Sequence, residues 1–193
     1  MRLLKFCLII GSLLLMTTGA FAQSEPTTRG ERAEVHFLEG MMDHHQMAVD
    51  MANDCLNKAS DEALRTLCQN IIAAQSAEIA QMQGWLKDWY GVEYAPMPMQ
   101  AGDEHDMSGM DMPAADPPMT MGMMAGLNRL EGRDYEIAWV ESMIDHHDDA
   151  LHMSERLLTR VVHDELSALA NQIIEDQTAE IAMMEAMLER LGS

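Results

Sequence analysis

Two pairs of adjacent histidines, His44-His45 and His146-His147, are the residues of this chain best suited to chemistry. Each pair follows an aspartate, and methionines stand at helical spacing on both sides of it. Imidazole nitrogen and thioether sulfur are donors that suit soft ions such as Cu(I) and Ag(I). The repeated pattern therefore predicts a metal-binding protein. The competing interpretation is a hydrogen-bonded histidine pair among core methionines.

The histidine pairs belong to a duplication with an offset of 102 residues. Residues 37–51 align with 139–153, and the register continues without a gap to the segments 75–82 and 177–184. On a helix that turns by about 100° per residue, His44 and His45 fall on either side of Met41. We therefore expect both imidazoles to flank the buried stripe of the helix.

Downstream of each pair, a Gln-x-x-Glu segment places a carboxylate on the inward face of the next helix. Glu78 projects close to the direction of Ile71, and Glu180 repeats this arrangement in the second half. Because a buried carboxylate without a partner is costly, we expect both glutamates to meet the histidines across the core. They are candidates for metal ligands or for acceptors that fix the imidazole tautomer. The alternative is a structural histidine–glutamate hydrogen bond without an ion.

Each half of the duplication predicts a helical hairpin. Apolar residues recur every three or four positions over 31–92 and again over 127–193. Ser60 is the expected N-cap of the second helix, which ends near Gly91, and the later helices are expected near 134–160 and 164–191. Neither hairpin can bury its stripe alone. The expected fold is therefore all-α, a single antiparallel four-helix bundle.

The segment between the hairpins, residues 93–126, differs in composition. It carries five of the six prolines and nine of the 21 methionines. Core packing does not explain methionine among glycine, proline and aspartate, so we expect a long crossover linker that wraps soft ions. A hydrophobic tail that packs on the bundle is the alternative, and residues 120–130 are expected to include a short helix. The candidate ligands here are His105, Met107, Met110, Met112, Met119, Met121, Met123 and Met124.

The N-terminus has the pattern of a secretory signal peptide over residues 1–22. Arg2 and Lys5 precede a short apolar run, and Ala20-Phe21-Ala22 predicts cleavage after Ala22. We therefore expect a periplasmic or secreted protein with no stable membrane span once the signal is removed.

The chain is strongly acidic, with 32 aspartates and glutamates against 12 lysines and arginines. Loss of the signal peptide leaves a formal charge of about −22. Such a chain repels nucleic acid and anionic lipid, and it concentrates cations near its surface. A metal ion is accordingly the expected partner and nucleic acid is not, although simple solubility also explains the charge.

Cys55 and Cys68 are absent from the second copy, where Leu157 and Ala170 take their places. They flank the expected turn of the first hairpin, and an oxidising compartment permits a disulfide between them. Two buried free thiols and a copper–thiolate site are the alternatives.

The motifs together resemble a secreted family known as domain of unknown function family 305. The resemblance rests on Met41-x-Asp43-His44-His45 with Gln75-x-x-Glu78 and on their second copies, and it covers most of the chain after the signal. It implies a ferritin-type four-helix bundle that binds copper in the periplasm and supports copper tolerance through histidine and methionine. Carried over by position, the ligands are Met41, His44, His45, Met47, Met51, Met143, His146, His147 and Met153.

One position departs from the first copy. Asp149 stands where the first copy has Met47, so the second site is expected to be harder or weaker than the first. His152, which aligns with Asp50, is a candidate to compensate.

These observations favour a copper-binding protein that buffers copper or hands it to another copper-handling protein, rather than an enzyme. Cu(I) is the favoured ion, and Cu(II) and Ag(I) are further candidates. The rival is a ferritin-like di-metal oxidase or iron-binding protein built on Glu39, Glu78, Glu141 and Glu180. The second helix of each hairpin lacks the Glu-x-x-His motif of dinuclear iron bundles, which counts against this rival. A structural or interaction module without metal is the third reading.

Overall fold

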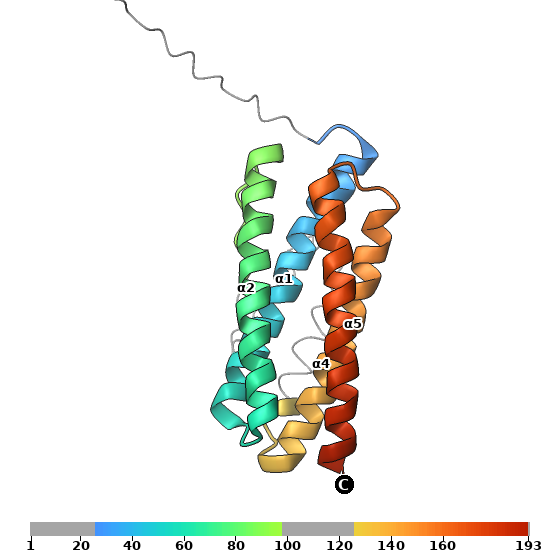
Figure 1. Cartoon of the computed structure of the whole chain (residues 1–193). Coiled ribbons are helices and arrows are strands. Elements are labelled where there is room, and N and C mark those ends of the chain that lie inside the picture. Colours follow the sequence, from blue (N-terminus) through green and yellow to red (C-terminus); the bar gives the residue numbers. More distant parts are fainter. Residues whose placement is uncertain (1–25, 98–125, 193) are drawn as a thin grey trace, which may run out of the picture.

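Apolar stripes on four long segments produce four helices in the computed structural model, which describes residues 26–97 and 126–192 (Figure 1). The helices are α1 (Arg29–Lys58), α2 (Glu62–Tyr90), α4 (Gly132–Leu158) and α5 (Asp164–Gly192). α1 packs against α2, α4 against α5, and α1 against α4. The predicted bundle of two helical hairpins is therefore confirmed. The expected signal peptide and most of the linker lie outside the described residues.

Local signals fix where the first two helices begin and end. Thr28 caps α1 in a capping box with Glu31. Asp61 caps α2, because its Oδ1 accepts the N–H of Leu64 at 2.9 Å. The prediction that Ser60 is this cap was wrong, since Ser60 makes its hydrogen bonds to the other hairpin. α2 ends where expected, at Tyr90, and its C-cap is Gly91, whose φ of 67° suits a residue without a side chain.

A fully buried carboxylate on α1, Glu34, holds the turn between α4 and α5. It accepts the backbone N–H groups of Val162 at 2.6 Å and His163 at 2.8 Å. It also accepts the hydroxyl of Tyr90 at 2.5 Å and lies 2.7 Å from Nδ1 of His163. Burial opposes the charge, but the hydrogen bonds from Tyr90, His163 and Val162 prevail and lower the pKa of Glu34 below its ordinary value.

In the second copy of the duplication, a buried glutamate holds the turn of the first hairpin at the other end of the bundle in the same way. Glu136, the counterpart of Glu34 on α4, is buried and accepts the N–H groups of Ser60 at 2.7 Å and Asp61 at 2.9 Å. The Ser60 hydroxyl donates to the same oxygen at 2.9 Å. Each hairpin therefore caps the turn of the other, which fixes how the two hairpins meet. Neither of these two contacts follows from the local sequence pattern.

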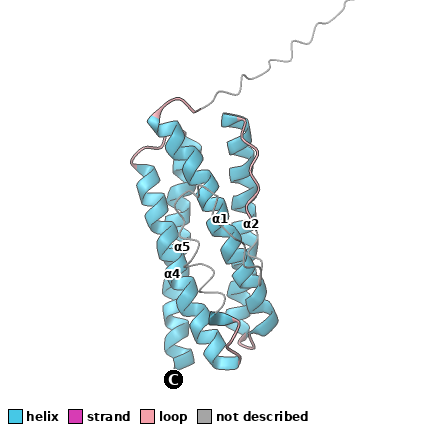
Figure 2. Ribbon diagram, turned by 180° about the vertical axis from the view of Figure 1, so that it is seen from behind, coloured by secondary structure: helices cyan, strands magenta, loops and turns pink. Residues whose placement is uncertain are grey.

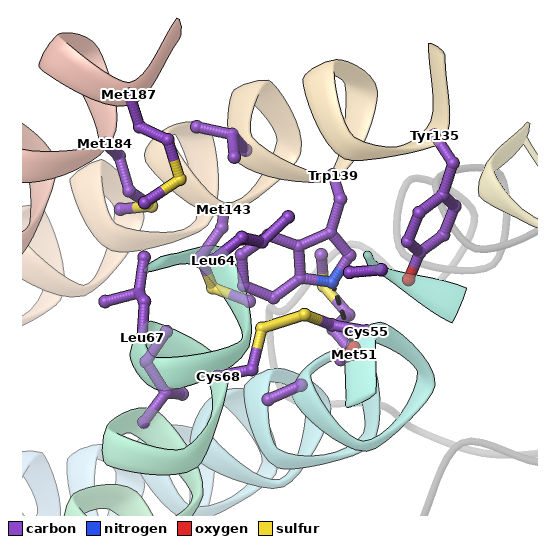
Figure 3. Packing of buried hydrophobic residues seen from close by; sticks show 14 of the residues in the cluster. Met51, Cys55, Leu64, Leu67, Cys68, Tyr135, Trp139, Met143, Met184 and Met187 are labelled. Atoms are coloured by element: carbon purple, nitrogen blue, oxygen red, sulfur yellow. Dashed lines mark hydrogen bonds between the residues drawn. A yellow bond between two sulfur atoms is a disulfide. The ribbon is translucent and has the colours of Figure 1, made fainter. Parts of the chain in front are cut away.

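Two apolar clusters fill the core, one toward each end of the bundle. One contains Trp139, Met51 and Met143 together with the disulfide (Figure 3). The indole N–H of Trp139 donates to the carbonyl of Met51 at 2.9 Å. The other cluster is built around Leu38, Leu86 and Leu166. Neither cluster includes a histidine, so the polar residues of the core form a separate layer between them.

A disulfide joins Cys55 on α1 to Cys68 on α2, and both residues are fully buried. This confirms the cross-link among the alternatives that the sequence left open, and it removes the copper–thiolate site because a disulfide sulfur carries no thiolate. No helix in the described part of the chain combines the length and apolarity needed to cross a membrane.

Replacing Glu136 by alanine should lower the free energy of unfolding by about 2–3 kcal/mol, because two backbone N–H groups lose a charged acceptor. Urea unfolding monitored by circular dichroism measures the change. Glu185→Ala on the exposed face of α5 is the control and should change stability little. A Glu136→Ala loss no larger than that of the control would contradict this role of Glu136.

The double variant Cys55→Ala/Cys68→Ala should lose about 3 kcal/mol, because the cross-link closes a short loop of the unfolded chain. A reducing agent should destabilise the wild-type protein by a similar amount and leave the variant unchanged. Equal urea midpoints for the reduced and oxidised wild-type protein would rule out this contribution.

Candidate metal centre

The four motif histidines lie together in the layer between the two apolar clusters. His45 and His147 are fully buried, and His146 and His44 are 1% and 8% exposed. α1 and α4 pack against each other here, and the rings of His44 and His146 lie in contact, with centroids 3.6 Å apart and their planes tilted by 32°. Nε2 of His146 lies 2.9 Å from the carbonyl oxygen of His44. The prediction that the adjacent histidines flank the buried stripe is confirmed.

The outer histidine of each pair meets a glutamate from the next helix. Nε2 of His147 lies 2.6 Å from a carboxylate oxygen of Glu180 as a hydrogen bond. Nε2 of His45 lies 2.7 Å from Glu78, an ion-pair distance without the alignment of a hydrogen bond. The expected meeting of glutamates and histidines across the core is therefore present in both halves. In this arrangement the glutamates orient the imidazoles.

Several buried polar atoms of the layer lack a hydrogen-bond partner. They include both ring nitrogens of His44, and Nδ1 of His45, His146 and His147. The amide nitrogen and oxygen of Gln75 also lack a hydrogen-bond partner. Because an unpaired buried polar atom costs free energy, the layer offers more nitrogen donors than the protein itself satisfies. Such donors fit a bound ion.

The central imidazoles are held in the form that binds metal. Burial, reinforced by the neighbouring imidazoles, lowers the pKa of His44 to about 3 and that of His146 well below its ordinary value. Both rings are therefore neutral at pH 7. A neutral imidazole has a free lone pair, and an ion that binds it has no proton to displace.

Methionines stand one turn from the central histidines on both helices. Met41 precedes His44 by three residues, and Met143 precedes His146 by the same spacing; both are fully buried. Residues at this spacing are neighbours on a helix surface. Met51 is also fully buried. Buried thioethers therefore stand one turn from the central imidazoles, within the apolar clusters on either side of the layer.

Other predicted ligands lie farther from the core. Met47 is half-buried, and half-buried Met153 reaches from α4 to Gly40 on α1, 3.5 Å from where a Cβ would stand. Asp149 and His152 are exposed, so neither enters the histidine layer. The sequence difference between the two copies at Asp149 therefore falls on the surface.

A segment after α2 breaks the symmetry of the layer. Residues 91–97 run back along α2 (Figure 2), where Gln83 donates to the carbonyl of Tyr94 at 3.2 Å. The Tyr94 hydroxyl then donates to Asp43 at 2.5 Å. Asp145, the counterpart of Asp43, is exposed. The start of the linker is thereby fastened beside the first histidine pair, a contact that the sequence analysis missed because only the tertiary fold brings Tyr94 to Asp43.

The predicted ligands of the linker and the carboxylates of the rival oxidase are the candidates that remain. The linker ligands from His105 to Met124 lie outside the described residues. The carboxylates of the rival oxidase include Glu141, which is exposed, and half-buried Glu39. Within the residues that the structure describes, no three side chains of His, Cys, Asp or Glu are grouped to hold a metal ion. The described residues therefore do not form a carboxylate-rich dinuclear site.

Stability of the metal-free protein should fall as the pH drops below about 6.5. The unfolded chain then binds protons at His44 and His146 that the folded state excludes. The free energy of unfolding should therefore fall by up to about 1.4 kcal/mol per pH unit for each histidine. Urea unfolding between about pH 7 and pH 5 measures this slope. His44→Gln/His146→Gln should flatten it, and exposed His36→Gln should not. An unchanged slope in the double variant would disprove the assignment.

Comparison with solved structures places this architecture among known proteins. CopM in its Cu(II)-bound form shares 31% identity with a TM-score of 0.64, covering 81% of this chain and 96% of CopM. CopM in its Cu(I)-bound form matches with 27% identity over the same shares and the same TM-score. A proposed secreted DUF305 protein from Streptomyces coelicolor shares 26% identity with a TM-score of 0.66, covering 83% of this chain and 93% of that protein.

No curated protein matches the sequence. The model of the domain of unknown function DUF305 matches residues 34–188, which include α2, α4, most of α1 and α5, both histidine pairs and both glutamates of the central layer. The chain is a member of the DUF305 family.

Proposed function

We propose that this protein binds copper as Cu(I), with Ag(I) as an equivalent ion, at the histidine layer between α1 and α4. The observation that carries the proposal is the set of neutral, buried ring nitrogens without partners on His44 and His146. Thioethers one turn away complete a soft donor set. The ligands proposed on the bundle are Met41, His44, His45, Met47, Met51, Met143, His146, His147 and Met153.

The relatives support this choice of ion. CopM has been solved with Cu(I), with Cu(II) and with silver, and each form resembles this chain over most of its length. Silver and Cu(I) share a preference for sulfur and imidazole donors. Glu78 and Glu180 are proposed to orient the outer imidazoles, a role that their contacts with His45 and His147 support.

The protein is proposed to work in the periplasm or outside the cell. The signal-like residues 1–22 support this location, as does the Cys55–Cys68 disulfide, because disulfides persist in oxidising compartments. The proposed secreted relative from Streptomyces agrees with it. In that setting the protein would buffer copper or pass it to another copper-handling protein and so support copper tolerance. We propose a binding protein rather than an enzyme.

The Met-rich linker is proposed to hold further ions. Thioethers bind without losing a proton, and they recur one to three residues apart around His105 and over 119–124. The fastening of Tyr94 to Asp43 supports the idea that these ligands begin beside the bundle site.

Anaerobic titration of the protein with Cu(I) against a competing chelator tests the bundle site. Met41→Leu and Met143→Leu should each weaken binding by about tenfold, the equivalent of about 1.4 kcal/mol. Met42→Leu and Met184→Leu are matched controls, because both methionines are fully buried but are not proposed ligands. Failure of the wild-type protein to bind more tightly than micromolar would end the copper proposal.

Changing the linker methionines to leucine tests the second set of ligands without shortening the chain. The variant replaces Met107, Met110, Met112, Met119, Met121, Met123 and Met124 together. The number of Cu(I) ions bound should fall, while the affinity of the bundle site should persist. An unchanged stoichiometry in the same titration would assign all the copper to the helices.

A further inference from the structure

An ion that reaches the histidine layer must cross the surface of the bundle somewhere. The layer is closed toward both ends of the molecule by the two apolar clusters. Passage of a charged ion through such clusters carries a large desolvation cost. A route from the side between two helices is therefore the one that remains.

The backbones of α2 and α5 approach each other less closely than those of the other neighbouring helices, although their side chains meet in both apolar clusters. The other three helix pairs of the ring, α1 with α2, α4 with α5 and α1 with α4, pack closely, and α2 and α5 make few close backbone contacts. A pocket of about 270 Å³ lies between α2 and α5. Carboxylates of Glu78 and Asp176 and amides of Gln81 and Gln172 line it, together with the apolar side chains of Ala74, Ala77 and Leu169. The two carboxylates attract a cation to this wall.

Glu78 belongs both to this pocket and to the histidine layer. Its carboxylate oxygen lies 2.7 Å from Nε2 of His45, which is fully buried, while its own side chain is 16% exposed. A cation that binds the Glu78 carboxylate from the pocket, in place of His45, therefore lies beside the His45 imidazole. One carboxylate thus connects solvent with the buried nitrogen donors.

A buried amide, Gln75, lies one helical turn from Glu78 on α2. Its side chain is 3% exposed and has no hydrogen-bond partner for either amide atom. Residues three apart on a helix share a face, so Gln75 and Glu78 form a polar track on the inner side of α2. An unsatisfied buried amide beside a carboxylate fits a position where water or an ion stays briefly.

We propose that the pocket between α2 and α5 is the access route for the ion. Asp176 and Glu78 accept the hydrated cation, and Glu78 passes it to the histidine layer as its contact with His45 opens. The small side chains of Ala74 and Ala77 keep the route open. This inference rests on the proposed function and adds the path by which the ion reaches the site.

The test blocks the route without changing the ligands. Ala77→Leu fills the pocket, and Ala73→Leu adds the same side chain to an exposed position of α2 that does not line it. Ag(I) is mixed rapidly with each protein, trapped with excess chelator at set times, and the silver retained on the protein is measured. Ala77→Leu should slow uptake by at least about tenfold. Release into the chelator should slow by the same factor, because a barrier on the path leaves the dissociation constant unchanged.

Asp176→Asn is a second variant, which removes charge without adding bulk and should slow uptake several-fold. Circular dichroism and urea unfolding establish that each variant folds. Wild-type rates in both Ala77→Leu and Asp176→Asn, with silver binding intact, would overturn the route and leave the copper proposal standing. A wild-type protein that retains no silver would overturn both.

Discussion

Burial of four imidazoles at the crossing of α1 and α4 is the constraint on which the rest of the structure depends. A bundle core must satisfy every polar group that it encloses, and this core encloses more ring nitrogens than it provides acceptors. The outer histidines each contact a glutamate, but the central pair of His44 and His146 is left with ring nitrogens that lack a hydrogen-bond partner. The apolar clusters on both sides keep these rings neutral. Unmet hydrogen-bonding capacity is therefore concentrated in one layer.

The duplication explains how such a layer is assembled with few independent elements. Two kinds of contact occur in both copies: Glu34 binds the turn between α4 and α5 as Glu136 binds the turn between α1 and α2, and each outer histidine contacts the glutamate of its own hairpin. The hydrogen bonds of Glu34 and Glu136 fix the position of one hairpin on the other. This position brings His44 into contact with His146. A small shift along the crossing would separate the two rings, so stability at the turns and geometry at the centre are linked.

The two halves of the bundle are not fully symmetric. The disulfide cross-links the first hairpin, Tyr94 donates to Asp43 while the counterpart Asp145 is exposed, and Glu78 lines the pocket between α2 and α5. The two halves of the layer therefore differ in their surroundings although their central residues are the same. The start of the linker lies beside the first histidine pair, whose outer imidazole also contacts the glutamate that reaches the pocket.

The sequence by itself determined the helices, the hairpin pairing and the inward placement of the histidines, because periodicity and duplication are properties of neighbouring residues. It also indicated that Glu78 and Glu180 would meet imidazoles, since a buried carboxylate requires a partner. Tertiary structure alone decided that the ring of His44 contacts that of His146, that Ser60 bonds to Glu136 rather than capping α2, and that Tyr94 reaches Asp43. These contacts join residues that are remote in the chain. Their geometry depends on how two helices cross, which no local pattern encodes.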